Sequence, residues 1–298
     1  MKPGAGTSEC GPGVGQERAL AGVLLRCVLA GVFLLAFLPA WKDLMSAWNT
    51  NEDASHGYLI VPVCVWLLWR KRSYLKFSES RGSGLGLSVA VLSLLLYMFS
   101  QLAEIETLSS LSMIGFFHGA VLYLWGIAAY RMMLFPLFFL FFMVPVPSQI
   151  YSQLSLPLQL FVSGISAHIA SLVGIPVYQV GNVIELPEKT LSIVKACSGV
   201  RSLVSILALC LLIGYVTMKS NVLRAVLFLS GIGVTILVNI LRVILLIVFL
   251  YYFRIDLAHG VQHTLFGMIV FMVSIAFILV FRKGLSYWDH PSEEGRSS

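Results

Sequence analysis

The sequence predicts an all-α polytopic membrane protein with about eight transmembrane helices. Three observations support this fold class: 58% of the 298 residues are apolar, only 11% are charged, and the mean hydropathy is +0.89. Soluble domains carry roughly 25% charged residues. The composition therefore excludes a water-soluble globule, a disordered chain and a nucleic-acid binder. The net charge of +6 fits basic residues that fix membrane topology.

Eight apolar segments are candidates for crossing a bilayer, which takes about 20 helical residues. We expect them at 19–40, 56–69, 85–103, 110–130, 132–147, 199–217, 222–250 and 264–281. The second and fifth are short and contain or adjoin prolines. We therefore expect these two helices to be tilted or kinked.

Basic residues orient the predicted spans. Arg70-Lys71-Arg72 follows the second span, Arg131 follows the fourth, and Arg282-Lys283 ends the eighth. Because Lys and Arg gather on the cytoplasmic side, both termini are predicted to lie inside. We expect three parts: a disordered cytoplasmic tail at 1–18, one transmembrane domain at 19–283, and a polar cytoplasmic tail at 284–298.

Residues 148–196 fit poorly as membrane and are predicted to form an extracytoplasmic insertion. Its first part, 150–174, has the pattern of an amphipathic helix on the outer surface. Alternating β-branched residues then flank Gly181-Asn182, which indicates a small β-hairpin, and a further alternating run covers 190–194. Open sheet edges cannot face lipid, so the hairpin must lie outside the bilayer.

Three polar residues interrupt the later spans: Cys197 opens the sixth, Arg242 lies within the seventh, and His263 opens the eighth. Polar residues in membrane helices are functional candidates. Counted from the cytoplasmic basic residue of each helix at 1.5 Å per residue, they lie about 33, 27 and 29 Å away. A hydrocarbon core is about 30 Å thick. We therefore expect a thiol, a guanidinium and an imidazole to meet near the outer boundary.

These three groups suit acyl transfer through a thioester. A thiol near a cation ionises more readily, and the thiolate is the nucleophile. An imidazole can take and return protons near neutral pH. A guanidinium keeps its charge and can stabilise an oxyanion. No metal is needed for this chemistry, and no cofactor is predicted.

Each candidate also has an ordinary structural interpretation. A lone cysteine in an apolar helix is usually inert packing, which is how we interpret Cys27, Cys64 and Cys210. The long side chain of Arg242 could reach the membrane surface with its charged end. Asn239, one turn earlier, lies on the same face of the helix, and this polar face weakens that interpretation. Arg201, one turn after Cys197, could favour the thiolate, bind a substrate carboxylate or bind lipid headgroups. His259 competes with His263 for the same role.

The segment Ala196-Cys197-Ser198-Gly199-Val200-Arg201-Ser202 resembles the exosortase/archaeosortase family. Further motifs carry the same resemblance in order along roughly 40–283. They are Ser55-His56-Gly57-Tyr58-Leu59 before Trp69-Arg70-Lys71-Arg72, Phe135-Pro136 through Val144-Pro145-Val146-Pro147, Leu156-Pro157-Leu158-Gln159-Leu160, Gly181-Asn182-Val183-Ile184-Glu185-Leu186-Pro187, Asn239-Ile240-Leu241-Arg242-Val243 and His263-Thr264-Leu265-Phe266-Gly267. The ordered set is specific, whereas any single motif is weak.

The resemblance implies a membrane cysteine transpeptidase or protease in the bacterial inner membrane, with its active site facing the periplasm. Its substrates are exported proteins with a C-terminal sorting tail: a Pro-Glu-Pro-type signal, a transmembrane helix and a basic cluster. By motif position, Cys197 is the nucleophile and Arg242 and His263 complete the catalytic set. Arg201, Asn239, Ser198 and His56 are the predicted substrate-binding residues. Membrane lipids and a surface acceptor such as an exopolysaccharide are the other partners implied; nucleic acid is not.

Two other functions stay open from the sequence. The same polar residues could line a solute path in a non-catalytic scaffold or transporter, although no inverted repeat relates the two halves. A membrane acyltransferase could use the histidine without the thiol. A zinc protease is disfavoured because the chain contains no HExxH, and the five cysteines show no CxxC or paired spacing.

Overall fold

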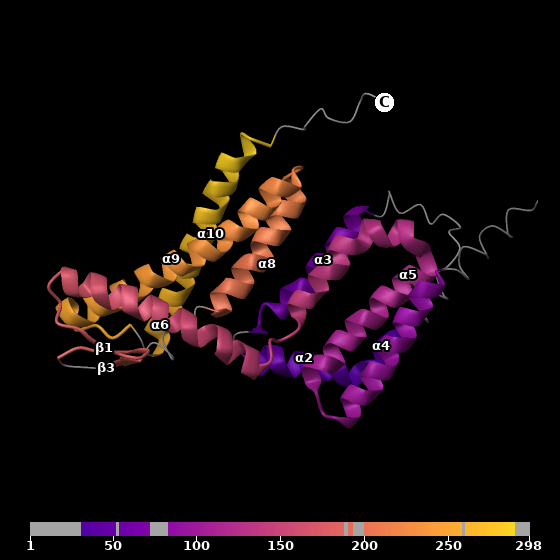
Figure 1. Cartoon of the computed structure of the whole chain (residues 1–298), viewed down its shortest axis with the longest axis horizontal. Helices are drawn as coiled ribbons and strands as arrows, with labels where there is room; N and C mark the ends of the chain where they lie inside the picture. Colours follow the sequence, from indigo (N-terminus) through magenta and orange to yellow (C-terminus); the bar gives the residue numbers. More distant parts are fainter. Residues whose placement is uncertain are drawn as a thin grey trace, which may run out of the picture. The chain divides into compact units, whose positions relative to one another are not determined.

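The computed structural model describes residues 31–51, 54–71, 83–187, 190–192, 200–257 and 260–289 (Figure 1). The chain forms two compact units. The first comprises Met1–Asn51 and Leu67–Val144, and the second comprises Glu52–Trp66 and Pro145–Ser298. Helix α3 (Gly57–Lys71) contributes residues to both units, with Pro62 inside it. The single transmembrane domain expected from the sequence stays a prediction.

The first unit contains α2 (Leu38–Thr50), α4 (Gly84–Leu102), α5 (Glu106–Phe139) and the short 3-10 helix η2 (Leu140–Met143). Helix α2 runs ten residues beyond the predicted end of the first span at 40, and most of that span lies outside the described residues. The indole N–H of Trp48 donates to the carbonyl of Met143 at 2.9 Å. This buried bond ties α2 to η2.

Helix α5 is two arms that fold back on each other at Gly126. The glycine has φ 73° and ψ 179°, a backbone conformation that residues other than glycine rarely adopt. His118 Nδ1 lies 2.9 Å from the Tyr130 hydroxyl, although twelve residues of straight helix span about 18 Å. The reversal therefore comes before the predicted boundary at Arg131, between the spans expected at 110–130 and 132–147, and Arg131 lies inside the second helical arm.

Helices α4 and α5 approach closely because each helix places a glycine against the backbone of the other. Gly115 and Gly119 form a GxxxG motif on α5. A Cβ on Gly119 would lie 2.5 Å from the Ala90 backbone nitrogen, and one on Gly86 would collide with the backbone at Tyr123. Only glycine fits either position without moving a helix.

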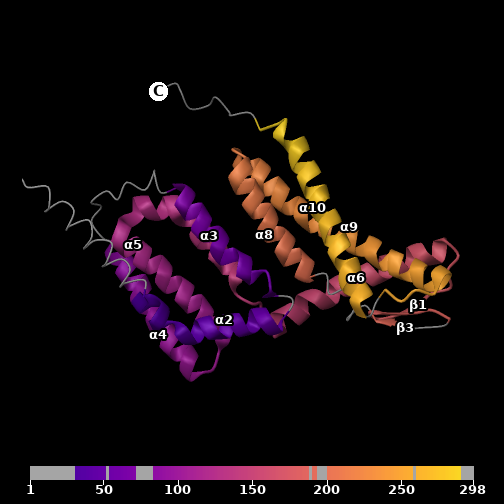
Figure 2. The same ribbon diagram turned by 180° about the vertical axis from the view of Figure 1, so that it is seen from behind.

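The second unit contains α6 (Ser148–Leu172), β1 (Tyr178–Val180), β2 (Val183–Glu185), β3 (Thr190–Ser192), α8 (Val200–Thr217), α9 (Asn221–Phe253) and α10 (Gly260–Ser286). Helices α8, α9 and α10 lie side by side in both views (Figures 1 and 2). Their shared core contains Ile206, Cys210, Met218, Leu227 and Ile278. These helices occupy the predicted sixth, seventh and eighth spans, and α10 extends beyond both predicted ends.

The three strands form an antiparallel sheet in the order β1-β2-β3, where the sequence indicated a hairpin. Gly181 has φ 62°, as the first loop residue of a type II′ turn requires. Two hydrogen bonds hold this turn on α6. Gln179 Nε2 donates to Ser163 Oγ at 2.9 Å, and Asn182 Nδ2 donates to Gln159 Oε1 at 3.2 Å.

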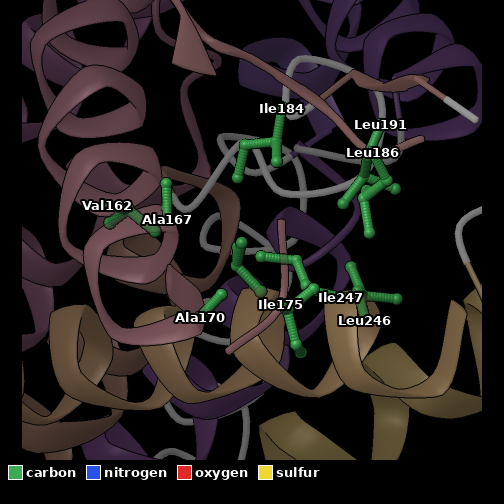
Figure 3. Packing of buried hydrophobic residues seen from close by; sticks show 10 residues of the cluster. Val162, Ala167, Ala170, Ile175, Ile184, Leu186, Leu191, Leu246 and Ile247 are labelled. Atoms are coloured by element: carbon green, nitrogen blue, oxygen red, sulfur yellow. The ribbon is translucent and has the colours of Figure 1, made fainter. Parts of the chain in front are cut away.

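A second core joins the sheet, α6 and the C-terminal part of α9 (Figure 3). Ile184 and Leu191 extend from the sheet toward Leu246 and Ile247 of α9, while Val162 packs from α6. The 33 residues of α9 span about 50 Å, longer than a hydrocarbon core of about 30 Å. One part of α9 therefore packs with membrane helices and the other with the sheet.

Five described helices are long and apolar enough to cross a membrane. They are Gly84–Leu102, Glu106–Met143 (α5 continued by η2, with the reversal at Gly126 inside it), Ser148–Leu172, Asn221–Phe253 and Gly260–Ser286, with a shorter apolar helix at Ser202–Thr217. The chain is a predominantly helical, multi-pass membrane protein. The number of eight spans stays a prediction. The expected helix at 150–174 is present as α6, whose length and composition also allow it to span the membrane rather than lie on the surface.

Polar contacts close the turn between α8 and α9. Arg224 donates from Nε and Nη2 to the Met218 carbonyl, at 3.0 and 2.6 Å. The Asp289 carboxylate accepts the backbone N–H groups of Lys219 and Ser220, at 2.9 and 3.0 Å. These two backbone donors hold the pKa of Asp289 below its usual value. Asp289, three residues after the end of α10, is thereby bonded to the turn that precedes α9.

Replacing Gly119 with alanine should destabilise the first unit, because the new methyl group meets the Ala90 backbone. Overpacking of this kind costs about 1–3 kcal/mol. Gly84→Ala is the matched control, since a Cβ there has nothing within 4 Å. Thermal unfolding in detergent should show a lower midpoint for Gly119→Ala alone. Equal midpoints for the two variants would contradict the close α4–α5 contact.

The Asp289 contact should be lost in acid. Because the pKa of Asp289 is lowered in the folded state, its contribution is present above the ordinary value near 4 and disappears as the pH falls through the lowered value. Hydrogen exchange at the amides of Lys219 and Ser220 should therefore be slower than in Asp289→Ala at pH 7, and equal to it well below pH 4. Identical exchange at pH 7 would refute the contact.

Candidate active site

Helix α9 carries a buried polar face between its two apolar clusters. Thr235 and Asn239 are 3% and 7% exposed. The Thr235 hydroxyl donates to the Gly231 carbonyl of its own helix at 2.7 Å. Asn239 Nδ2 is also buried, but among the described residues it has no hydrogen-bond acceptor. An unpaired buried donor costs about 1–3 kcal/mol, so this amide requires an explanation.

Arg242, one turn after Asn239, meets His263 of α10. Its Nη2 lies 3.5 Å from Nδ1 and 3.4 Å from Nε2 of the imidazole. These near-equal distances are at the long limit of hydrogen bonding, so the guanidinium is not aligned with one ring nitrogen. Helices α9 and α10 pack against each other and bring the two groups side by side.

The Arg242 Nε atom is buried and, within the described part of the chain, has no acceptor. Asn239 and Arg242 therefore present two unpaired donors on successive turns of α9. Buried N–H donors of this kind can hold a carbonyl oxygen or an oxyanion. Beside them, the imidazole of His263 supplies a group that can transfer protons.

The comparison with protein-family models gives a match over residues 48–280, to the transmembrane exosortase family. The chain belongs to this family. The match covers most of the chain and includes α3, α4, α5, α6, the sheet, α8, α9 and most of α10. Neither the curated proteins nor the solved structures gave a significant match.

Family membership indicates the general activity of this exosortase. Exosortases are generally cysteine transpeptidases of membranes, and they act on proteins that carry sorting signals. Arg242 and His263, which the resemblance and the depth estimate both selected, are in contact in the structure. Their catalytic roles stay a prediction.

Several predicted site residues are not in the described part of this exosortase. Cys197 and Ser198 lie outside the described residues, as does His259. Arg201 belongs to the first turn of α8, but its side chain is likewise outside the description. His56 lies just before α3, in the second unit, and is half-buried.

The other cysteines of the exosortase can be placed in part. Cys64 and Cys210 are buried, and Cys210 packs against Gly231 at the α8–α9 contact. Cys27 lies outside the described residues. Within the described residues, no group of three His, Cys, Asp or Glu side chains could hold a metal ion.

The site contains one residue to which sequence reasoning assigned no role. Gly267 ends the histidine motif and lies four residues after His263, so both occupy one face of α10. A Cβ on Gly267 would lie 3.5 Å from Arg242 Nη2. The four-residue spacing was the available signal, but it could not show that a side chain from another helix occupies the space.

Proposed function

We propose that this exosortase is a cysteine transpeptidase or protease that cleaves the C-terminal sorting signal of exported proteins through a thioester. The observation that carries the proposal is the contact between Arg242 and His263, which joins a permanent cation to a proton-transfer group inside a membrane protein. The substrate signal is of the Pro-Glu-Pro type, followed by a transmembrane helix and a basic tail.

The depth of the site in the membrane supports a substrate of this kind. Arg242 is 18 residues after Arg224 on α9, about 27 Å along the helix, and His263 is 19 residues before Arg282 on α10, about 29 Å. Both distances match a hydrocarbon core of about 30 Å. A substrate helix with its basic tail in the cytoplasm would bring its signal to the same outer boundary. In this proposal the site faces the periplasm from the bacterial inner membrane.

The first half-reaction forms the thioester. His263 takes the proton of the Cys197 thiol, and the thiolate forms a C–S bond to the signal's carbonyl carbon. The carbonyl π electrons move to oxygen, and Arg242 donates hydrogen bonds to this oxyanion. The oxyanion then collapses, the C–N bond breaks, and the leaving amine takes the proton from His263.

In the second half-reaction an acceptor replaces the thiol. A hydroxyl or amine of a surface acceptor, or water, gives its proton to His263 and attacks the thioester carbonyl. The C–S bond then breaks, and Cys197 leaves as a thiolate that recovers the proton. Asn239, Arg201, Ser198 and His56 are the residues that we propose bind the signal. The buried Nδ2 of Asn239, which has no acceptor in the part of the chain that the structure describes, supports its role, because a substrate oxygen would satisfy it.

Replacing Cys197 with alanine should abolish cleavage of a membrane reporter that ends in a sorting tail, because no other group forms the thioester. The precursor should accumulate at its full mass. Cys210→Ala is the matched control, since Cys210 is fully buried within the helix packing and should leave the cleaved product detectable. Intact-mass spectrometry of the reporter measures both outcomes. Normal processing by Cys197→Ala would refute the nucleophile.

Asn239→Leu should separate substrate binding from structure. The substitution keeps the branched shape and the number of side-chain heavy atoms and removes the buried donor, so the thermal midpoint should stay the same or rise. A hydrogen bond to a charged oxygen is worth about 1.5–3 kcal/mol, so kcat/KM should fall roughly 10- to 160-fold. A lower midpoint with unchanged kcat/KM would instead make Asn239 a structural residue.

A further inference from the structure

The guanidinium of Arg242 lies against a position where α10 has no side chain. A Cβ built on Gly267 would lie 3.5 Å from Nη2, 3.9 Å from Cζ and 4.0 Å from Nη1. Because the three distances are similar, the guanidinium group lies across the glycine and does not point one nitrogen at it. His263, one turn earlier on the same face, contacts the same Nη2.

The backbone does not require glycine here. Gly267 lies inside α10, and its φ is not in the left-handed region, unlike Gly260 at the start of that helix. Glycine in a helix interior is less favourable than alanine by about 0.8–1 kcal/mol. Arg242 lies directly beyond the Cβ position, so a side chain longer than alanine would meet the guanidinium. Gly284 on the same helix differs, since a Cβ there would have nothing within 4 Å.

We propose that Gly267 is a positioning residue that sets the place of the Arg242 guanidinium beside His263. This inference rests on the proposed function, in which Arg242 stabilises the oxyanion. A side chain with γ carbons at position 267 would occupy the space of the guanidinium. Arginine is long and flexible, so Arg242 would turn away from His263 while its methylene stem stayed packed. The helix would remain folded, but the oxyanion donor would be misplaced.

The size of the side chain gives a graded test. A methyl group at 3.5 Å is in ordinary van der Waals contact, so Gly267→Ala should keep kcat within about threefold of the parent enzyme. Gly267→Leu should lower kcat by at least about 30-fold, with KM changed less than threefold, because the lost interaction belongs to the transition state. Gly284→Leu is the matched control for adding leucine to α10 and should leave kcat and KM unchanged.

A second measurement does not depend on activity. Phenylglyoxal modifies accessible guanidinium groups, and mass spectrometry of the peptide that contains Arg242 follows the rate. Gly267→Leu should raise this rate several-fold at an unchanged thermal midpoint, whereas Gly267→Ala and Gly284→Leu should not. Parent-like kcat and an unchanged modification rate in Gly267→Leu would overturn the proposal. A lower kcat in Gly267→Leu together with a lower thermal midpoint would also overturn it, since that would indicate a structural role.

Arg242→Gln separates this inference from the proposed function. If Arg242→Gln loses cleavage while Gly267→Leu keeps it, the proposed function stands and the positioning role of Gly267 fails. If Arg242→Gln cleaves like the parent enzyme, the catalytic role of Arg242 fails, and any effect of Gly267→Leu on kcat cannot act through it. The phenylglyoxal rate still decides whether Gly267 holds the guanidinium in place.

Discussion

Helix α9 is held along its length by two different hydrophobic clusters, and the candidate site depends on this constraint. Leu227 is buried among α8 and α10, whereas Leu246 and Ile247 are buried under the sheet and α6. A helix fixed in this way cannot slide along its axis without exposing one cluster. Arg242 therefore keeps its level, and α10, which packs on α9, keeps His263 beside it.

Sequence patterns predicted much of this arrangement because bilayers impose simple rules. Hydropathy located α8, α9 and α10, and alternation around Gly181 located the sheet. The reversal inside α5 was placed too late, because the fourth span was expected to end just before Arg131 while the backbone turns at Gly126. The contact between Gly119 and α4 was also not predicted. Both depend on where backbone lies in three dimensions, which hydropathy does not record.

The candidate site was predictable to a similar extent. Depth along helices depends only on residue counts, so the level of Arg242 and His263 could be estimated before the fold was known. Whether side chains at one level face each other depends on the rotation of each helix, which the packing of α9 on α10 decides. Gly267 shows the same limit: its spacing from His263 is visible in the sequence, but its neighbour comes from another helix.

The polar face of α9 is costly for folding, and this cost bears on function. Asn239 and Arg242 each bury a donor that has no acceptor among the described residues, and Gly267 weakens the helix that faces them. An apolar face would avoid the cost of the two donors. Packing alone therefore does not account for Asn239 and Arg242. A bound oxygen would satisfy the donors and would need the space beside His263, which is what an acyl-transfer site requires.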